Sequence, residues 1–419
     1  MRTGNNFRWW IAILIALATA INYLDRLALP VAISEIKKTI PVSDSQFGTI
    51  NSLFLLAYGT MYALGGRIID VMGSRAGYAL MIAWWSVANM FQGLVSSVMG
   101  LGFARFFLGA GEGGGFPGSA KVVSEWFPQK ERAFAFGIFN TGSSIGGIVA
   151  PPLLAFIITT LGWRWAFIIS GMFGLVWVVA WLRIYSHPSV NKFVSPQERN
   201  FIETENALHV VDDGKLPWLS LFRYRSVWGL LTIKFFSDAA WFFFIFWLPK
   251  YLSDVKGLNI VGVGAYAWIP YAFAGAGSFI GGWFSSYLLT RGLSLDLSRK
   301  ICLGISAALL PASLFITEAS LGAGIVFFSM AMFGHQSWAT IVQTLAADMF
   351  HSKIVGSVAG LMGCVGTYGA MIFSLVIGFV IEEFGYSPAF LVAGILHPIS
   401  FLLVFLIIRK IEVVKLNRT

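Results

Sequence analysis

The sequence is poor in charge, because only 12% of its 419 residues are Asp, Glu, Lys or Arg. A soluble domain carries about 25% charged residues, which keep its folded surface hydrated. Hydrophobic residues instead make up 57% of this chain. They recur in runs of roughly 20 residues, each long enough to cross the hydrocarbon core of a bilayer. The shortage of charge therefore excludes an ordinary soluble protein and predicts an all-α membrane protein.

The sequence also lacks the residues and motifs of catalysis and metal binding. Its two cysteines, Cys302 and Cys364, lie in apolar stretches without the spacing of a metal or redox site, so we expect them to be packing residues. It has no phosphate-binding glycine loop, no zinc-type spacing and no nucleophile–base motif in a suitable context. These absences argue against an enzyme, and no cofactor or metal site is expected.

Twelve apolar stretches alternate with charged or turn-rich breaks. The first follows directly on MRTGNNFRWW with no small-residue cleavage site behind it, so we interpret it as a retained span and not as a signal peptide. An even number of spans places both chain ends on the same side of the membrane. The predicted spans are 9–32, 46–68, 75–96, 98–121, 132–159, 165–185, 226–251, 262–290, 299–317, 321–347, 354–381 and 387–408.

Lysine and arginine are distributed unequally between the two sets of loops. The chain ends and the loops that follow even-numbered spans carry 20 of the 29 basic residues, whereas the opposite loops carry 5. Because basic loops stay in the cytoplasm, both termini are predicted to be cytoplasmic, in the inner (plasma) membrane of a bacterium. The net charge of +9 then reflects membrane topology, and no nucleic-acid partner is needed to explain it.

The only long polar stretch, 186–225, divides the chain into six spans and six spans. We interpret it as a solvated cytoplasmic linker with short surface helices, in preference to a regulatory module. Motifs repeat across it, since 66–75 after the second span is echoed by 282–292 after the eighth, and 124–127 by 347–350. The expected fold is two pseudo-symmetric six-helix bundles, 1–185 and 226–419, that rock around a substrate site near mid-membrane.

The loop after the second span, Gly66-x3-Asp70-x2-Gly73-x-Arg75, is similar to that of the major facilitator superfamily. Further motifs resemble its anion:cation symporter family, and the resemblance covers nearly the whole chain. It implies the major facilitator fold with twelve transmembrane helices, and import of organic anions, mainly sugar acids, together with protons. These further motifs lie at 23–26, 111–117, 124–132, 142–152, 162–167 and 246–251.

The motifs at 334–338 and 344–350 are most similar to those of hexuronate transporters, which carry glucuronate and galacturonate. Aldonate and aldarate carriers are close relatives, and the aldonate carriers have an asparagine where this chain has Thr367. A hexuronate is therefore the expected substrate, with an aldonate or an aldarate as the alternative. A drug exporter is disfavoured by the span-five motif. A non-transporting sensor on a carrier fold is disfavoured by the short tail after the last span.

Away from the span ends, four charged residues lie inside predicted spans of the first half: Asp25, Arg26, Arg105 and Glu112. A charge at the centre of a spanning helix costs about 2.5–3.5 kcal/mol, so such residues are functional candidates. The planar guanidinium of Arg26 can hold a carboxylate through two charge-assisted hydrogen bonds, and Tyr58 can add a phenolic one. We expect both to bind the substrate anion. The alternatives are a structural ion pair for Arg26 and packing for Tyr58.

Glu112 and Asp25 are the expected proton-binding acids, and Arg105 is the base expected to couple them. A carboxyl group buried away from water can take up a proton near neutral pH. Arg105 and Glu112 stand seven residues, or about 10.5 Å, apart on one helix, too far for a direct pair. Asp25 is therefore the expected partner of Arg105, in a pair that exchanges as the proton moves. The alternative is a static charge network between spans one and four.

The second half is expected to supply groups that bind the sugar hydroxyls. His335 and Gln336 in span ten are the polar candidates, and Trp338 can stack on the apolar face of a sugar ring. Thr367 completes the predicted substrate site, and Asn140 is a further candidate.

Acids and bases near the cytoplasmic ends of spans are expected to form or anchor a gate. Asp70 is expected to pair with a base or a helix end across this gate, and Arg75 to anchor the next span. Lys234 and Asp238 form an i,i+4 pair that we expect to be self-neutralising. The expected partners are a sugar-acid anion, protons and the lipid bilayer, and the protein is expected to be a monomer. The predicted gate residues are Asp70, Arg75, Glu125 and Asp348.

Overall fold

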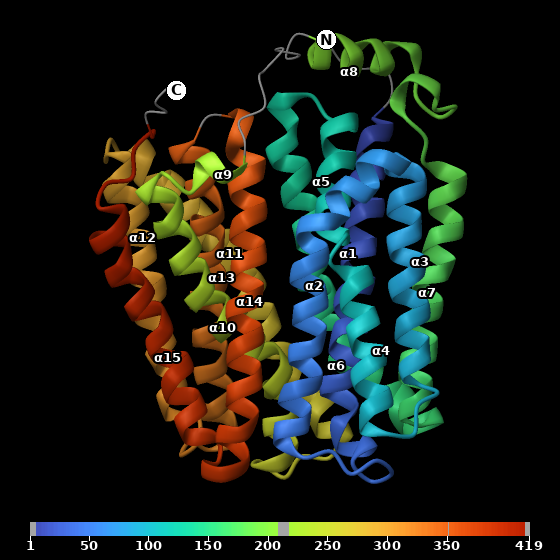
Figure 1. Cartoon of the computed structure of the whole chain (residues 1–419), viewed down its shortest axis with the longest axis vertical. Helices are drawn as coiled ribbons and strands as arrows, with labels where there is room; N and C mark the ends of the chain where they lie inside the picture. Colours follow the sequence, from blue (N-terminus) through green and yellow to red (C-terminus); the bar gives the residue numbers. More distant parts are fainter. Residues whose placement is uncertain (1–5, 208–217, 351, 415–419) are drawn as a thin grey trace.

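The computed structural model describes residues 6–207, 218–350 and 352–414, and these residues are almost entirely helical (Figure 1). Ten helices within this described part are long and apolar enough to cross a membrane. The all-α membrane class predicted from the sequence is thereby confirmed. Two predicted spans, 75–96 and 98–121, correspond to helices outside this set of ten, so the count of twelve spans stays a prediction.

The first half of the chain runs from α1 to α7. The predicted span 98–121 is not one helix: α4 ends at Glu112 and α5 begins at Gly115, because two consecutive glycines between them have low helix propensity. The elements are α1 (Phe7–Ile36), α2 (Asp44–Met72), α3 (Ser74–Gln92), α4 (Val98–Glu112), α5 (Gly115–Trp126), α6 (Gln129–Leu161) and α7 (Trp163–Ile184).

The second half runs from α10 to η3. In Figure 1 its helices stand to the left of those of the first half, and the long helices run roughly parallel. The elements are α10 (Arg225–Asp254), α11 (Ile260–Thr290), α12 (Leu295–Leu309), η2 (Leu310–Phe315), α13 (Leu321–Met349), α14 (Ser352–Phe384), α15 (Tyr386–Leu403) and the π-helical turn η3 (Val404–Ile408).

Single glycines make the sharpest turns between consecutive helices. Gly73 separates α2 from α3, Gly162 separates α6 from α7, and Gly385 separates α14 from α15. Their φ angles of 78°, 92° and 73° lie in the left-handed region that residues with a side chain rarely adopt. These positions let one helix follow another without a loop.

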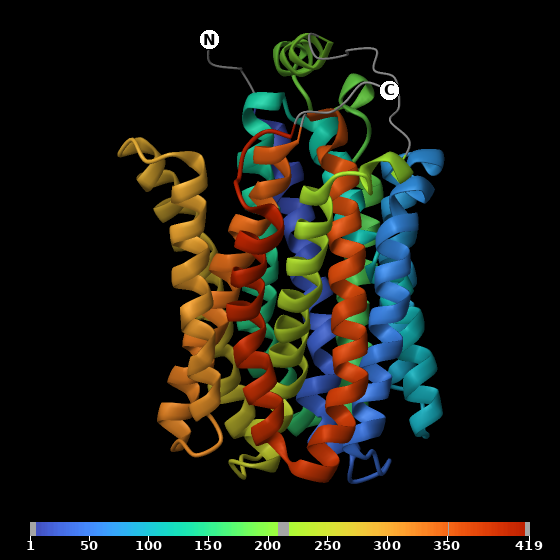
Figure 2. The ribbon, with the colours of Figure 1, turned by 60° about the vertical axis from the view of Figure 1, so that its left-hand side comes forward.

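The predicted linker 186–225 contains η1 (Pro188–Val190), α8 (Pro196–Ala207) and α9 (Trp218–Leu221), and its residues 208–217 lie outside the described part. Helix α8 lies across one end of the molecule, which we call the α8 end (Figures 1 and 2). It is more firmly held than a solvated linker, because the fully buried Glu198 accepts hydrogen bonds from Arg8 Nη1 and from the first two amides of α1. Glu131 of α6 binds the same arginine at 2.7 Å.

The two halves meet mainly through α2 against α14 and α6 against α11. At the end opposite α8, which we call the Asp44 end, the Ser45 amide donates to Glu382, and glycines pack backbone to backbone where Gly48 meets Gly378. Further along the contact between α2 and α14, Gly363 lies against the ring of Tyr62.

Beyond that point the halves separate. Gly360 and Gly356 lie one and two turns further along the α2-facing side of α14, and a methyl group added at either position would meet nothing within 4 Å. Contacts between α6 and α11 are likewise found from Gly264 to Gly275 and lie toward the Asp44 end. The molecule is therefore closed at the Asp44 end and loosely packed between its halves at the α8 end.

Candidate functional site

Arg26 and Glu112 form a buried ion pair between α1 and α4. Both Nε and Nη2 of Arg26 donate to Oε2 of Glu112, at 2.9 and 2.8 Å, and Nη2 also donates to Asn22 at 3.0 Å. The side chains of the ion pair are 4% and 0% exposed. The partner of Glu112, which the sequence left open, is thus the arginine predicted to bind the substrate.

Arg105 lies on α4 two turns before Glu112, and two of its three side-chain nitrogens lack hydrogen-bond partners in the described part. Its Nη2 donates to the carbonyl oxygen of Arg26 at 2.8 Å, whereas Nε and Nη1 have no hydrogen-bond partner among the described residues. The guanidinium lies 4.7 Å from the ring centroid of Phe54 and 5.6 Å from that of Phe246. A fully buried cation held mainly by aromatic faces and one carbonyl contributes positive potential to the site.

Asp25 points away from this cluster. Its Oδ1 accepts a hydrogen bond from Asn89 of α3 at 2.7 Å, and its Oδ2 is buried without a partner in the described part. The Arg105–Asp25 ion pair suggested by the sequence is not formed here, because adjacent residues on a helix point about 100° apart. Asn89, which also binds Ser170 of α7, was not predicted, since no sequence motif marks it.

Glycines in α4 let the neighbouring helices approach the charged residues. A Cβ atom at Gly109 would overlap the carbonyl oxygen of Phe54, and one at Gly113 would overlap that of Tyr58. These contacts bring α2 against α4 at the level of Arg105 and Glu112.

Replacing Gly109 by alanine is expected to force α2 and α4 apart and to lower stability by about 1–3 kcal/mol, the usual cost of overpacking. The thermal midpoint of the purified protein should fall, and transport should fall with it. The matched control is Gly137→Ala in α6, where the added methyl group meets nothing within 4 Å and should leave the midpoint unchanged. Equal midpoints for both variants would contradict this account of the packing.

A small cavity lies between the two halves beside the ion pair. Tyr23 in its wall also contacts Arg26, whose guanidinium carbon lies 5.0 Å from the tyrosine ring centroid. The ring of Tyr58 is equally close, at 4.8 Å. The space open to water is about 10 Å³, room for about one water molecule, so a larger solute needs the walls to separate. The cavity is lined by Tyr23, Ser143, Ser144, Trp241, Tyr271, Ala274 and Gln336.

The residues predicted in α13 diverge from one another. Gln336 lines the cavity, whereas His335 stacks on Trp241 with ring centroids 4.8 Å apart and lies 3.1 Å from His397. Trp338 is fully buried in the second half, where its ring packs against that of His397. Neither His335 nor Trp338 lines the cavity, because successive helical positions turn by about 100°.

Thr367 and Asn140 do not line this cavity. Thr367 is buried where α14 meets α2, with its hydroxyl donating to the carbonyl oxygen of Gly363 and its methyl group facing Gly59. Asn140 is exposed on α6. The cavity residues Ser143, Ser144 and Tyr271 were not predicted, and small polar or phenolic residues within apolar spans were the signal that could have indicated them.

Three of the predicted gate residues, Asp70, Arg75 and Asp348, lie at the α8 end, and each makes a contact within its own half. Asp70 pairs with Lys121 at 2.6 Å, and Arg75 donates to the carbonyl oxygen of Leu182 at 2.5 Å. Asp348 pairs with Arg299 at 2.7 Å. In this state these three contacts hold together the helices of one half.

Glu125 accepts hydrogen bonds from Ser74 and from the hydroxyl of Tyr185, each at 2.6 Å. Burial and the neighbouring carboxylate raise the pKa of Tyr185, so the phenol stays protonated and donates. This predicted gate residue therefore joins α3, α5 and the end of α7 in this state.

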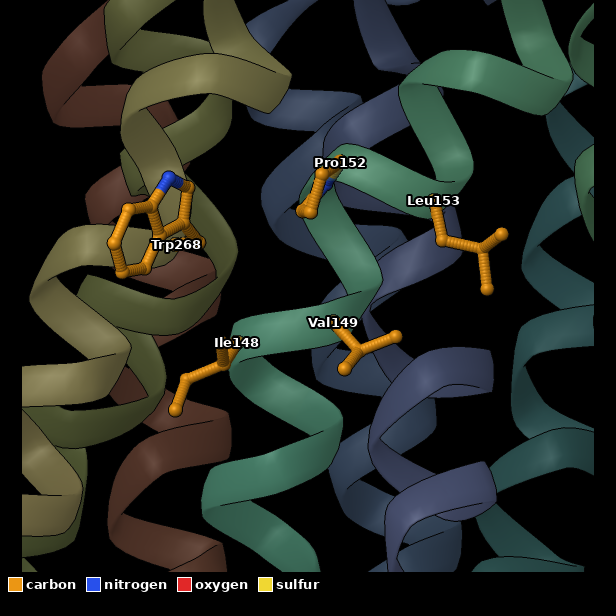
Figure 3. Close-up of a pocket in the computed structure, with 5 residues that line it drawn as sticks. All are labelled: Ile148, Val149, Pro152, Leu153 and Trp268. Carbon is orange, nitrogen blue, oxygen red and sulfur yellow. The ribbon is translucent and has the colours of Figure 1, made fainter.

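Two remaining features do not form an anion site. Lys234 and Asp238 pair at 2.7 Å, in agreement with their predicted mutual neutralisation. A groove of about 390 Å³ where α6 meets α11 is lined by apolar residues (Figure 3), so it offers no group to hold a carboxylate. Its walls are Ile148, Val149, Pro152, Leu153 and Trp268.

A family model and two similar bacterial proteins match most of this chain. Residues 15–334 match the family model described as Major Facilitator Superfamily. The chain is 32% identical to a hexuronate transporter of Escherichia coli (strain K12), over 98% of this chain and 96% of the relative. It is 31% identical to a probable galactarate/D-glucarate transporter of the same strain, over 99% of this chain and 98% of the relative.

Solved structures share the fold at lower identity. A bacterial homologue of the human lysosomal transporter Spinster superimposes with a TM-score of 0.74 at 18% identity, covering 97% of this chain and 98% of the other.

Proposed function

The chain belongs to the major facilitator superfamily of transporters, and we propose that it imports a sugar acid together with protons by alternating access. The observation that carries the proposal is the buried Arg26–Glu112 ion pair beside a cavity between the two halves. A sugar acid brings a carboxylate, and the guanidinium fork of Arg26 suits it.

The membrane arrangement we propose has twelve spans in two six-helix bundles, with the α8 end in the cytoplasm of a bacterial cell. The excess of basic residues in the loops at that end supports this orientation. The tight packing at the Asp44 end then corresponds to a state closed toward the outside. Rocking of the bundles opens each side in turn.

The ion pair links anion binding to proton binding. Asp25 and Glu112 balance Arg26 and Arg105 in charge, so the unoccupied site is neutral. A substrate carboxylate competes with Glu112 for the same guanidinium and adds one negative charge, which is costly inside the membrane. A proton on Glu112 removes both the competition and the excess charge. Asp25, whose Oδ2 has no partner in the described part, is the second proposed proton acceptor.

The substrate we propose is a hexuronate, with an aldonate or an aldarate as the alternative. The E. coli relatives named above are a hexuronate transporter and a probable galactarate/D-glucarate transporter. Around Arg26, the cavity offers hydroxyl groups from Tyr23, Ser143 and Ser144 and the amide of Gln336. Trp241 and Tyr271 offer aromatic faces that can pack against the C–H face of a sugar ring.

Uptake of radiolabelled glucuronate or galacturonate into proteoliposomes tests this function. With an inward gradient of one pH unit and one proton per substrate, the substrate should accumulate about tenfold, because one unit corresponds to about 1.36 kcal/mol. Competition by unlabelled aldonates and aldarates identifies the preferred class. Accumulation that follows a sodium gradient and ignores pH would overturn the proton assignment, and uptake inhibited by no sugar acid would overturn the substrate class.

A further inference from the structure

We propose that Asp44 of α2 and Lys250 of α10 form a lock between the two halves, broken and remade in every transport cycle. Nζ of Lys250 lies 2.5 Å from Oδ1 of Asp44, and the lysine side chain is 0% exposed. Among the ion pairs whose two side chains both lie in the described part of the chain, this one alone joins the first half to the second. It lies at the end where the halves are closed.

Each partner also has a second counter-ion within its own half. Lys250 contacts Asp254, one turn along α10, and lies 3.3 Å from the hydroxyl of Tyr386, while Asp44 lies 3.3 Å from Lys37. Breaking a buried ion pair normally strands a charge, which is strongly unfavourable. Here Lys250 keeps Asp254 and Asp44 keeps Lys37 when the halves part. The pair therefore opens without leaving a buried charge uncompensated, as a reversible contact requires.

Aromatic residues shield the lysine of this ion pair from water, whereas the Asp44 side chain is 20% exposed. Phe47 of α2 packs edge-on against Trp247 of α10 with ring centroids 5.0 Å apart, and Trp247 packs against Tyr386 at 6.0 Å. Nζ of Lys250 lies 5.4 Å from the Trp247 ring centroid. Exclusion of water strengthens the attraction between the two charges. When the rings of Phe47 and Trp247 separate, water reaches Lys250 and weakens the ion pair. The ring contact and the ion pair are therefore expected to form and break together.

The position of the lock assigns different roles to the two ends. At the α8 end, Asp70 and Asp348 pair within their own halves, so those pairs do not change when the halves move as rigid bodies. At the Asp44 end, the Asp44–Lys250 pair must change. The lock thus stabilises the state closed at the Asp44 end and sets how often the site opens on that side.

A cysteine-accessibility measurement tests the lock. The background is Cys302→Ser with Cys364→Ser, and the reporter is Ser374→Cys, on the α14 face that contacts Gly48, where the native serine is 4% exposed. A membrane-impermeant maleimide is added from the outside to intact cells. Asp44→Asn and Lys250→Met should each raise the labelling rate about fivefold or more, because the open state gains population.

The double variant Asp44→Asn/Lys250→Met decides whether the two residues act as a pair. It should label no faster than the faster single variant, since the second substitution removes nothing further. Lys38→Met, which removes the exposed pair with Glu35, is the matched control and should leave the rate unchanged.

Unchanged labelling in both single variants, or single effects that multiply in the double variant, would overturn the lock. Misfolded variants are identified because they label at the reporter even in the cold, where the conformational exchange of folded protein is slow; a fast cold rate in both singles also counts against the lock. The inference rests on the proposed alternating access. It needs no sugar acid and no proton gradient, so failure of the substrate assignment leaves this measurement unaffected.

Discussion

Replacing Arg26 by alanine is expected to weaken binding of the sugar acid by about 100-fold or more. Hydrogen bonds to a charged partner contribute about 1.5–3 kcal/mol each, and the variant loses the two that a guanidinium fork makes with a carboxylate. Uptake by proteoliposomes should fall to background. Thermal-shift titration of the purified protein with glucuronate and galacturonate measures the loss directly.

Two further variants separate binding from folding. Arg26→Ala leaves the carboxylate of Glu112 buried and unpaired, which costs about 3–5 kcal/mol of stability. Arg26→Ala/Glu112→Gln should recover most of the thermal midpoint without recovering binding. Arg26→Lys keeps the charge but not the fork, and should bind with intermediate affinity. Normal transport by Arg26→Ala would refute the assignment of the anion site.

Replacing Glu112 by glutamine is expected to uncouple transport from the proton gradient. The amide has the shape of a protonated carboxyl group and leaves Arg26 free for the substrate, but it cannot release a proton. Exchange of labelled for unlabelled substrate should persist. Under a gradient of one pH unit, however, the ratio of internal to external substrate should fall from about ten to about one. Counterflow and gradient-driven uptake in the same proteoliposomes measure the two activities.

Glu125→Gln provides the matched control for this substitution. Glu125 lies at the α8 end, bound to Ser74 and Tyr185, and is remote from the Arg26 site. This variant should retain coupling even if its transport rate falls. Uphill accumulation by Glu112→Gln would show that another group carries the proton, and Asp25 would be the next candidate.

The membrane fold was largely predictable, because span length, loop charge and in-span charge are properties of local sequence. The break between α4 and α5 was not predicted, although the run from Gly113 to Gly115 signals low helix propensity. Hydropathy did not reveal this break, because an apolar stretch has the same mean hydropathy whether its helix is broken or continuous.

The contacts within the site were less predictable than its members. Arg26 and Glu112 are 86 residues apart, and their pairing depends on how α1 packs against α4. Sequence spacing showed only that Arg105 and Glu112 could not pair with each other. The divergence of His335 from Gln336 depends on the rotation of α13 within its bundle, which a hydrophobic run on all sides of a helix does not specify.

The proposed Asp44–Lys250 lock likewise could not be predicted from sequence spacing. In the sequence, Lys250 stood out only as part of the motif at 246–251 and as one of the loop charges, and nothing distinguished Asp44. The complete burial of Lys250 and its contact with the other half follow from tertiary packing. Charges that join two distant segments are therefore the part of a transporter that sequence periodicity describes least well.

If the substrate carboxylate and a proton compete for the Arg26–Glu112 pair as proposed, substrate binding takes up a proton. Titration calorimetry of the purified protein with glucuronate or galacturonate, repeated in buffers of different ionisation enthalpy, gives the number of protons taken up per substrate bound. We expect about one proton for the wild type, because the substrate carboxylate displaces Glu112 from Arg26, and none for Glu112→Gln. Binding by the wild type with no proton uptake at any pH between about 5 and 8 would contradict this expectation.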